Sequence, residues 1–423
     1  MFEKDRCRAG NIRAATPFAQ RETVSETPPG ALAGLRVLDL SRVLAGPLCS
    51  MMLGDLGANV IKIERPGSGD DTRSWGPPWA EGSAGRESAY YLCANRNKRS
   101  VAVDLKQAEG QALVRRLASE ADVLLENFAP GLLQEWGLGY DDLAATNPEL
   151  VYCSITGYGT SGPDAGRPGY DFAVQARAGW MAVTGDPGGE PVKAGTALAD
   201  VLAGQNAAVA ILAALYERTR SGKGQRIEVS LFDSAVAGLV NVAQAALTTG
   251  LEPQRWGNAH PTIVPYQTFR AADRPFVVAV GNDAQWRRLC AAVGLDALGT
   301  DPRFANNPGR VENRGIVTAL LAERFAGRSA GEWLADLQRA GVPCGPVQSV
   351  QEAVRDPALR ERGGIWHMSG PAFGETESVA SPLRLERTPP TLRRPPPALG
   401  EQTEEVAREG WASGYSRGGS PGW

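Results

Sequence analysis

The stretch from Leu35 to Arg73, LRVLDLSRVLAGPLCSMMLGDLGANVIKIERPGSGDDTR, decides the fold expected for this chain. An apolar run at 35–40 predicts a strand, and the Ala45-Gly46-Pro47 that follows predicts a helix start, because proline is well tolerated in a first helical turn. A second apolar run at 60–63 predicts a strand that ends at Glu64-Arg65. The resulting βαβ unit places a ligand at the carboxyl ends of its strands.

The first turn of this unit lacks the fingerprint of a dinucleotide site. That fingerprint needs three glycines, whereas the turn contains only Gly46. Strands are expected at 35–40, 60–63, 100–103, 123–125, 151–155 and 226–230, with helices between them such as 109–119 and 200–218. This alternation predicts a Rossmann-like, mostly parallel sheet covered by helices. We therefore expect a nucleotide-like ligand other than NAD.

Composition narrows the class of protein further. The chain has 423 residues, 43% of them hydrophobic, and a net charge of −3, which suggests two domains and, without a basic tract, no general nucleic-acid binding. No apolar run approaches the roughly 20 residues of a membrane span. Six scattered cysteines without a C-x-x-C pair indicate reduced thiols in a cytoplasmic setting. No His/Cys/Asp cluster has zinc spacing, so no metal is expected.

Six further strings occur in a fixed order along the chain: NRNKRSVAVDLK (95–106), ADVLLENFAPG (121–131), LVYCSITGYGTSGP (150–163), SGKGQRIEVSLFD (221–233), GVPCGPV (341–347) and RPPPALGEQTEEV (394–406). With the opening segment they resemble the class III CoA-transferases, the family of formyl-CoA transferase, carnitine CoA-transferase and alpha-methylacyl-CoA racemase. The resemblance is colinear from about residue 33 to 408. It implies a Rossmann-like large domain, a smaller α/β domain and an interlocked homodimer. It also implies no tightly bound cofactor, with coenzyme A as part of the substrate.

The expected domain organisation combines this resemblance with local sequence pattern. Residues 1–30 form a disordered extension, 31–249 the first part of a large CoA-binding domain, and 250–347 a linker and small domain. A strand at 276–280 and helices at 284–293, 311–325 and 330–340 are expected in the small domain. Residues 348–408 return to the large domain through a proline-rich linker, which the family resemblance implies. A disordered tail is expected from 409 to 423.

Asp200 is the strongest catalytic candidate. It heads a long helix rich in small residues, and taken alone it is typical of a helix N-cap. The resemblance places it at the family's nucleophilic aspartate, in the matching A-L-x-D-x-x-x-G string. A carboxylate nucleophile splits one difficult acyl transfer into easier steps. We expect the helix N-terminus to hold this carboxylate ionised.

The racemases of the same fold carry a histidine where this chain has Tyr170, in the string Gly169-Tyr170-Asp171. The only two histidines, His260 and His367, lie far downstream. Proton transfer at an α-carbon needs groups with a pKa near the working pH, and a tyrosine pKa of about 10 fits poorly. A transferase is therefore favoured, while a racemase, an inactive acyl-CoA-binding regulator and an NAD-dependent enzyme are the alternatives.

Coenzyme A brings phosphates, which require cations near the sheet edge. Five basic residues cluster there in sequence: Arg65, Arg96, Lys98, Arg99 and Lys106. The resemblance implies CoA contacts at Leu44, Ala45, Arg65, Val103, Lys106, Asn127 and Phe128, and we add Tyr170 and Asp171 as candidates.

Two departures concern substrate choice. Formyl-CoA transferase has a glutamine in place of Leu44 and a glycine-rich flap where this chain has RWGNAHPTIVPYQTF (255–269), so formyl-CoA and oxalate are disfavoured. The strings GDDTRSWGPP, YYLCANRNKRS and SITGYG resemble the branch of the family that exchanges CoA between succinyl-CoA and glutarate. A dicarboxylate needs a cation for its distal carboxylate, and the candidates are Lys193, Arg255 and His260. The backbone N–H groups of Gly257-Asn258 are the expected oxyanion donors. A formyl-CoA-type or carnitine-type transferase is the alternative within the family.

Overall fold

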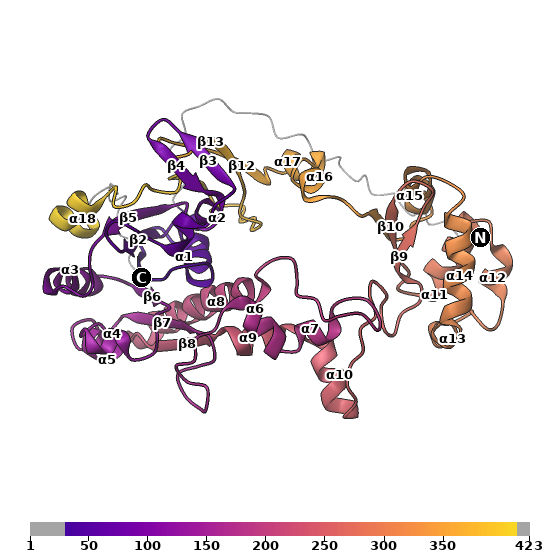
Figure 1. The fold of residues 1–423 in the computed structure, drawn as a ribbon, viewed down its shortest axis with the longest axis horizontal. Helices are drawn as coiled ribbons and strands as arrows, with labels where there is room; N and C mark the ends of the chain where they lie inside the picture. Colours follow the sequence, from indigo (N-terminus) through magenta and orange to yellow (C-terminus); the bar gives the residue numbers. More distant parts are fainter. Residues whose placement is uncertain (1–29, 413–423) are drawn as a thin grey trace, which may run out of the picture.

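A computed structural model describes residues 30–412 of the chain, with a six-stranded parallel sheet at the centre of its larger part (Figure 1). In spatial order the strands are β5 (Lys98–Ala102), β2 (Asn59–Glu64), β1 (Arg36–Asp39), β6 (Val123–Glu126), β7 (Val151–Thr156) and β8 (Arg226–Ser230). The first strand lies inside the sheet and the order reverses between β1 and β6, as in dinucleotide-binding folds. The predicted Rossmann-like sheet is confirmed, and each strand ends within two residues of its expected bounds.

Both faces of this sheet are buried, because successive strand residues point to opposite faces. The helices of this part are α1 (Ala45–Asp55), α2 (Ala89–Leu92), α3 (Ala108–Ala118), α4 (Leu132–Glu135), α5 (Tyr140–Ala144), α6 (Asp171–Arg177), α7 (Trp180–Val183), α8 (Leu198–Ser221), α9 (Leu231–Gly238) and α10 (Asn241–Thr249), with a 3₁₀ turn η1 (Asp71–Ser74). Val37 of β1 faces a core shared with four helices, α1, α6, α8 and α9, whereas Leu38 faces the core on the other side.

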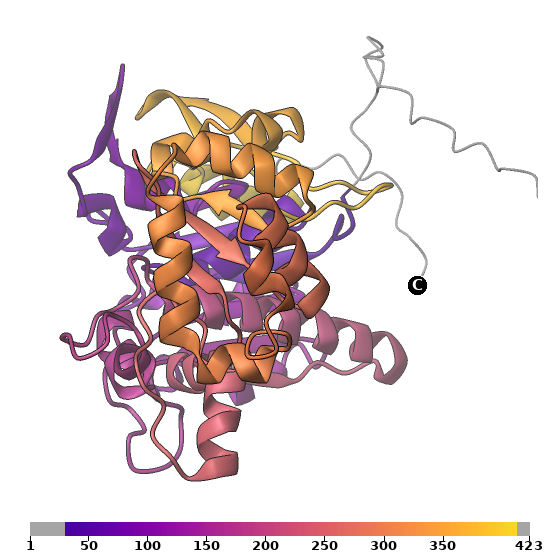
Figure 2. The same cartoon turned by 90° about the vertical axis from the view of Figure 1, so that its right-hand side faces the viewer.

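A second, separate core lies at the opposite end of the molecule (Figures 1 and 2). Its antiparallel sheet has the order β11 (Cys344–Pro346), β10 (Pro275–Ala279), β9 (Tyr266–Arg270). Phe325 packs against Phe269, Phe276 and Trp333 with ring centroids 5.0 to 5.3 Å apart. The surrounding helices are α11 (Asp283–Ala292), α12 (Asp296–Thr300), α13 (Asn307–Glu312), α14 (Arg314–Phe325) and α15 (Ala330–Arg339). The single helix expected at 311–325 is therefore broken, at Asn313.

The last part of the described chain returns to the first sheet (Figure 1). It contains α16 (Val350–Val354), α17 (Pro357–Glu361), the hairpin of β12 (Ile365–Gly370) and β13 (Gly374–Val379), α18 (Thr403–Glu409) and the turn η2 (Gly410–Ala412). A second hairpin, β3 (Trp79–Gly82) and β4 (Gly85–Ser88), packs beside the first, and neither was expected. Trp411 is buried and its Nε1 donates to the Leu117 carbonyl at 2.9 Å, so the chain is packed through Ala412 and the tail expected from 409 is wrong up to that point. The disorder expected at 1–29 and 413–423 lies outside the described residues.

One expectation about apolar segments also needs correction. Over residues 30–412, α8 is long and apolar enough to cross a membrane, with a hydropathy of 1.7, and the bent pair of α9 and α10 passes the same test only when taken together. The prediction that no apolar run approaches the length of a membrane span is therefore wrong for α8. In α8, 44% of the apolar window is already buried inside the molecule, and the helix packs on α1, α6, α9 and the sheet, which is the position of a core helix.

Candidate active site

Asp200 is the third residue of α8, two residues beyond the helix start, and not its N-cap. Ala197 holds the N-cap position, and the cap hydrogen bond comes from elsewhere: the Ala199 N–H donates to Asp171 Oδ1 at 2.7 Å. The other oxygen of Asp171 accepts from Gln175 Nε2 at 2.7 Å. The N-cap interpretation of Asp200 is therefore wrong, because Asp171 caps the helix.

The carboxylate of Asp200 is thus left available for chemistry. Across residues 30–412 no hydrogen bond or ion pair engages it. Burial, and secondarily the negative charge of Asp171, raise the pKa of Asp200 to about 7. We had expected the helix terminus to hold this group ionised, but its surroundings oppose ionisation. A poorly solvated, unpaired carboxylate is a strong candidate for a nucleophile.

The start of α1 lies directly against this part of α8. A Cβ on Gly204, one turn after Asp200, would lie 2.6 Å from the carbonyl oxygen of Ala45, so only glycine permits this approach. The N–H groups of Leu44, Ala45 and Gly46 make no hydrogen bond within the described chain, as expected of a helix start. The start of α1, with its unused N–H groups, therefore packs against the first turns of the helix that carries Asp200.

Two aromatic residues near this site were missed by sequence reasoning. Burial, and next the charge of Asp200, raise the pKa of Tyr90 to about 12, so its phenol stays protonated beside Asp200 and can donate a hydrogen bond. Trp75 packs edge-on against Tyr90 with ring centroids 5.1 Å apart, and it is partly exposed. Both occur inside strings that carried the family resemblance, and that was the only available signal.

Of the five basic residues that cluster in the sequence, three are buried and two are exposed. Arg96 pairs with Asp55 at 2.7 Å and Lys98 with Asp39 at 3.2 Å, and both cations are almost completely buried. Arg99 is buried as well. The string that contains them is typical of a solvated loop and, less often, of a phosphate site. Neither interpretation holds for these three side chains, because they are buried at or just before the amino end of β5.

Arg65 and Lys106 remain exposed near the carboxyl ends of the strands. Arg65 pairs with Asp71, and Arg42, which sequence reasoning overlooked, pairs with the same carboxylate at 3.1 Å. Two guanidinium groups around one carboxylate leave a net positive charge there. Val103 directly follows β5, and its N–H donates to the Glu64 carbonyl.

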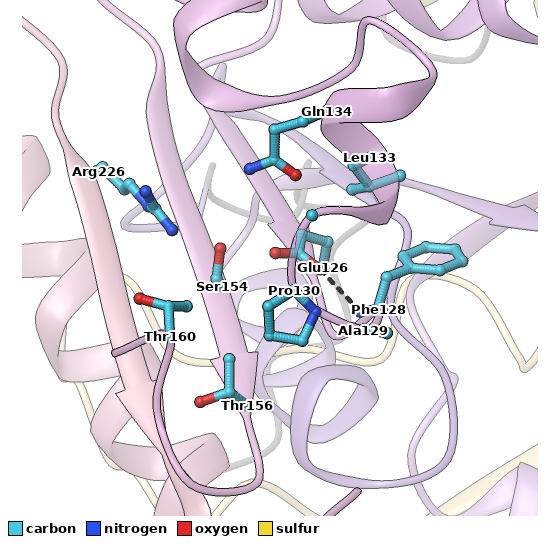
Figure 3. A pocket seen from close by; sticks show the side chains of 11 residues that line it. Glu126, Phe128, Ala129, Pro130, Leu133, Gln134, Ser154, Thr156, Thr160 and Arg226 are labelled. Carbon is cyan, nitrogen blue, oxygen red and sulfur yellow. Dashed lines mark hydrogen bonds between the residues drawn. The ribbon is translucent and has the colours of Figure 1, made fainter. Parts of the chain in front are cut away.

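Asn127 and Phe128 directly follow β6. The Asn127 amide makes two hydrogen bonds with the backbone of Arg42, at 2.9 and 2.7 Å, so it holds the loop after β1. Phe128 packs against Trp136. Beside Phe128, a cavity of about 200 Å³, partly open to solvent, lies at the carboxyl ends of β6 and β7 and beside the first residue of β8 (Figure 3). Arg226 points into it with no hydrogen bond or ion pair in the described chain.

The candidates around residue 257 have roles other than those expected. The Gly257 N–H donates to the Gly185 carbonyl at 3.1 Å, so it is not a free oxyanion donor, and within residues 30–412 no hydrogen bond joins Asn258 to Asp200. Arg255 donates to the carbonyls of Ala182 and Gly189, bracing the loop before α8. Burial, and next the charge of Arg314, lower the pKa of His260.

Lys193 and Tyr170 are the remaining candidates. Lys193 is exposed and donates only to the adjacent Ala194 carbonyl at 3.2 Å. Its segment is fixed near the site, because the Ala194 N–H donates to Gln175, the residue that also holds Asp171. Tyr170 is 69% exposed at the N-cap position of α6.

A switch-point sheet edge, an unpaired carboxylate and unused backbone N–H groups are features that acyl-transfer enzymes use. Residues 32–403 match the CoA-transferase family III. The chain is 44% identical over 384 residues to the succinate–glutarate CoA-transferase of Agrobacterium fabrum, covering 90% of this chain and 96% of that protein. It is 42% identical over 378 residues to human succinyl-CoA:glutarate CoA-transferase, covering 89% and 85%.

A solved structure gives the same result. The crystal structure of a CaiB/BaiF family protein from Brucella suis has a TM-score of 0.80 to this chain, with 44% identity, and the match covers 90% of this chain and 99% of that one. The chain belongs to CoA-transferase family III, and it is a CoA-transferase.

Proposed function

We propose that this CoA-transferase moves CoA from succinyl-CoA to glutarate or a similar short dicarboxylate, with Asp200 as the nucleophile. The observation that carries the mechanism is the unpaired, half-buried carboxylate of Asp200, in the part of α8 that packs against the start of α1. The substrate assignment rests on relatives of 42–44% identity whose names specify succinate and glutarate.

The reaction proceeds through four acyl transfers. Asp200 attacks the thioester carbonyl of the donor, which gives a mixed anhydride and releases the CoA thiolate. The thiolate then attacks the aspartyl carbonyl, which gives an aspartyl–CoA thioester and frees the donor acid. The acceptor carboxylate attacks this thioester to form a second anhydride and release the thiolate again. Finally the thiolate attacks the acceptor's acyl carbonyl, so that the new acyl-CoA leaves and the Asp200 carboxylate is restored.

Each of these steps develops an oxyanion that needs donors. The free N–H groups of Leu44, Ala45 and Gly46 replace the Gly257-Asn258 donors in this assignment. The phenol of Tyr90 adds a protonated donor near Asp200. The partly buried surroundings of Asp200 limit the access of water, which would hydrolyse the anhydride.

The CoA nucleotide lies along the carboxyl ends of the strands in this proposal. Arg65, Lys106 and the newly found Arg42 supply positive charge for the phosphates. Val103 and the loop of Phe128 flank the adenosine, and the cavity beside Phe128 takes its polar edge. Asn127 and Asp171 act by holding neighbouring backbone, whereas Tyr170 remains an exposed contact candidate.

Lys193 is the best-supported cation for the distal carboxylate of the acceptor. Arg255 is engaged with backbone carbonyls, and the lowered pKa of His260 leaves that ring uncharged at neutral pH. Lys193→Gln should reduce the preference for glutarate over butyrate by roughly ten-fold or more. Lys223→Gln, an exposed lysine in the turn after α8, is the matched control and should leave the preference intact. An unchanged preference in Lys193→Gln would remove Lys193 from the assignment.

The covalent route has its own test. During turnover with succinyl-CoA and glutarate, hydroxylamine should convert the activated aspartyl group into a hydroxamate on the peptide that contains Asp200. Asp200→Ala should abolish both the adduct and CoA transfer. A mass spectrum with no modified peptide, or activity retained in Asp200→Ala, would contradict this mechanism.

We further propose that the protein is a homodimer with the domain division 31–249, 250–347 and 348–408, located in the cytoplasm. Large apolar side chains are exposed on α6, α8 and around α10: Phe172, Val209, Tyr216, Val240, Leu247 and Leu251. Surfaces of this kind are usually covered by another protein. Sedimentation analysis should give the mass of a dimer. Leu247→Glu should weaken the association between the two subunits. The free thiols of Cys49, Cys153 and Cys290 favour a reducing compartment.

A further inference from the structure

The loop between β1 and α1 is held by side chains at every step. Five successive backbone groups of Ser41, Arg42 and Val43 each have a side-chain partner. These bonds are Ser41 N–H to Asp39 at 2.9 Å, Lys62 Nζ to Ser41 O at 2.7 Å, Arg42 N–H to Asn127 at 2.9 Å, Asn127 Nδ2 to Arg42 O at 2.7 Å, and Val43 N–H to Asp70 at 3.2 Å. Turn loops normally satisfy such groups with water or with their own backbone. Here four different segments of the chain fix one short loop.

Together these five hydrogen bonds form a clamp on the loop, and the residue that the clamp holds in an unusual backbone conformation is Val43. Its φ is +71°, a left-handed conformation that is strongly unfavourable for a β-branched residue. Such a conformation persists only when its surroundings over-determine it. The next three N–H groups, those of Leu44, Ala45 and Gly46, are the unused donors at the start of α1, which packs against the first turns of α8. The turn at Val43 therefore sets the direction in which these donors point.

A buried ion pair anchors the clamp. Lys62 Nζ lies 2.9 Å from Asp70 Oδ2, and both side chains are 0% exposed, so neither can touch a substrate. Asp70 also accepts hydrogen bonds from the N–H and hydroxyl of Thr72, which fix its carboxylate. Burial alone would raise the pKa of Asp70, but Lys62 and Thr72 lower it to about 2. The carboxylate thus stays charged across the working pH range.

We propose that Asp70 and Lys62 are positioning residues that hold Val43 in its left-handed conformation and thereby aim the N–H groups of Leu44–Gly46 at the oxyanion formed at Asp200. This inference rests on the proposed role of Asp200. Its consequence is that weakening the clamp slows the acyl transfers without weakening the binding of acyl-CoA to the same extent.

The test compares Asp70→Asn, Val43→Gly and the double variant in the full-length protein. Asp70→Asn keeps the shape of the side chain but loses the charge, and kcat should fall by about ten-fold to a hundred-fold, with a much smaller change in KM for succinyl-CoA. Val43→Gly should by itself lower kcat slightly, because glycine adopts positive φ without strain but fixes the turn less firmly than the clamped valine does. The double variant should recover a large part of the lost kcat, since glycine no longer needs the clamp.

A merely structural role predicts no such recovery. Asp122→Asn is the matched control: Asp122 bonds Arg218 and the Arg36 N–H at the opposite edge of the same sheet, so this variant should lose stability and keep kcat. If Asp70→Asn does not fold, Thr72→Val is the milder variant. It removes only the hydrogen bond from the Thr72 hydroxyl to Asp70, and it should also lower kcat.

Two kinds of failure are distinguishable. Wild-type kcat in Asp70→Asn, or no recovery in the double variant, overturns the positioning role. Absence of CoA transfer in the wild type, or activity in Asp200→Ala, overturns the proposed function instead.

Discussion

Replacing Asp200 by Asn should abolish CoA transfer and at the same time stabilise the protein at alkaline pH. The amide resembles a protonated carboxyl in shape, but it carries no charge to be buried near Asp171. Because burial and Asp171 raise the pKa of Asp200, the folded protein pays a cost whenever this group is ionised. Asn removes that cost together with the nucleophile.

The magnitude follows from the pKa of about 7 in the folded chain against 3.8 for the free group. A carboxyl with a raised folded-state pKa costs nothing below about pH 4, and its cost grows as the pH rises and is complete above pH 7. At 1.36 kcal/mol per unit, the cost is about 1.6 kcal/mol at pH 5 and about 4 kcal/mol at pH 8, both as upper estimates. For a chain of this length the latter corresponds to a rise in Tm of roughly 5 °C or less.

The assay is thermal unfolding of wild type and Asp200→Asn at pH 5 and pH 8. Asp233→Asn is the control, because Asp233 is the third residue of α9 as Asp200 is of α8, but it is exposed. The control should be neutral or slightly destabilising, since it loses only a favourable interaction with the helix dipole. A gain in Asp200→Asn that is independent of pH, or no gain at pH 8, would refute the explanation by a buried charge.

Three further predictions concern the same site. The kcat/KM for transfer should rise with pH through about 7 as Asp200 ionises, and a flat profile from pH 5.5 to 8 would contradict this. Asp171→Asn should move that rise to lower pH by removing the nearby charge, and it should cost about 1 kcal/mol of stability through the weakened cap on Ala199, as measured by denaturant unfolding. Gly204→Ala should lower both Tm and kcat, because its Cβ would meet the Ala45 carbonyl; wild-type values for both would show that α1 and α8 can separate freely.

The sheet could be predicted from sequence because its strands are buried on both faces. Val37 and Leu38 face opposite cores, so the strand appears in the sequence as a continuous apolar run. The same logic explains what was missed. The hairpin strands β3 and β13 consist of half-buried and exposed positions and contain glycine and glutamate, so they give no comparable apolar run. The break at Asn313 depends on helix capping within an otherwise helical pattern.

The candidate site was predictable only in part. The position of Asp200 came from the family resemblance. The role of Asp171 as the cap of the same helix could not be predicted in this way, because it depends on a hydrogen bond to Ala199, 28 positions away in sequence. A sequence shows which residues are charged but not whether they are buried. The basic string around Lys98 is compatible with a phosphate-binding site, yet Lys98 is completely buried against Asp39. Arg42 was overlooked for the converse reason, since one arginine in a loop carries no pattern.

The buried and exposed charges near the β1–α1 loop have complementary tasks. Lys62, Lys98, Asp39 and Asp70 balance one another inside the protein, so this group adds no net charge at the ligand edge. Positive charge toward a phosphate ligand is then left to Arg42, Arg65 and Lys106. Removal of a buried partner leaves an uncompensated charge and distorts the loop, whereas removal of an exposed arginine changes only attraction for the anion. The two groups should therefore separate in kinetics, the buried charges acting on kcat and the exposed ones on KM for acyl-CoA.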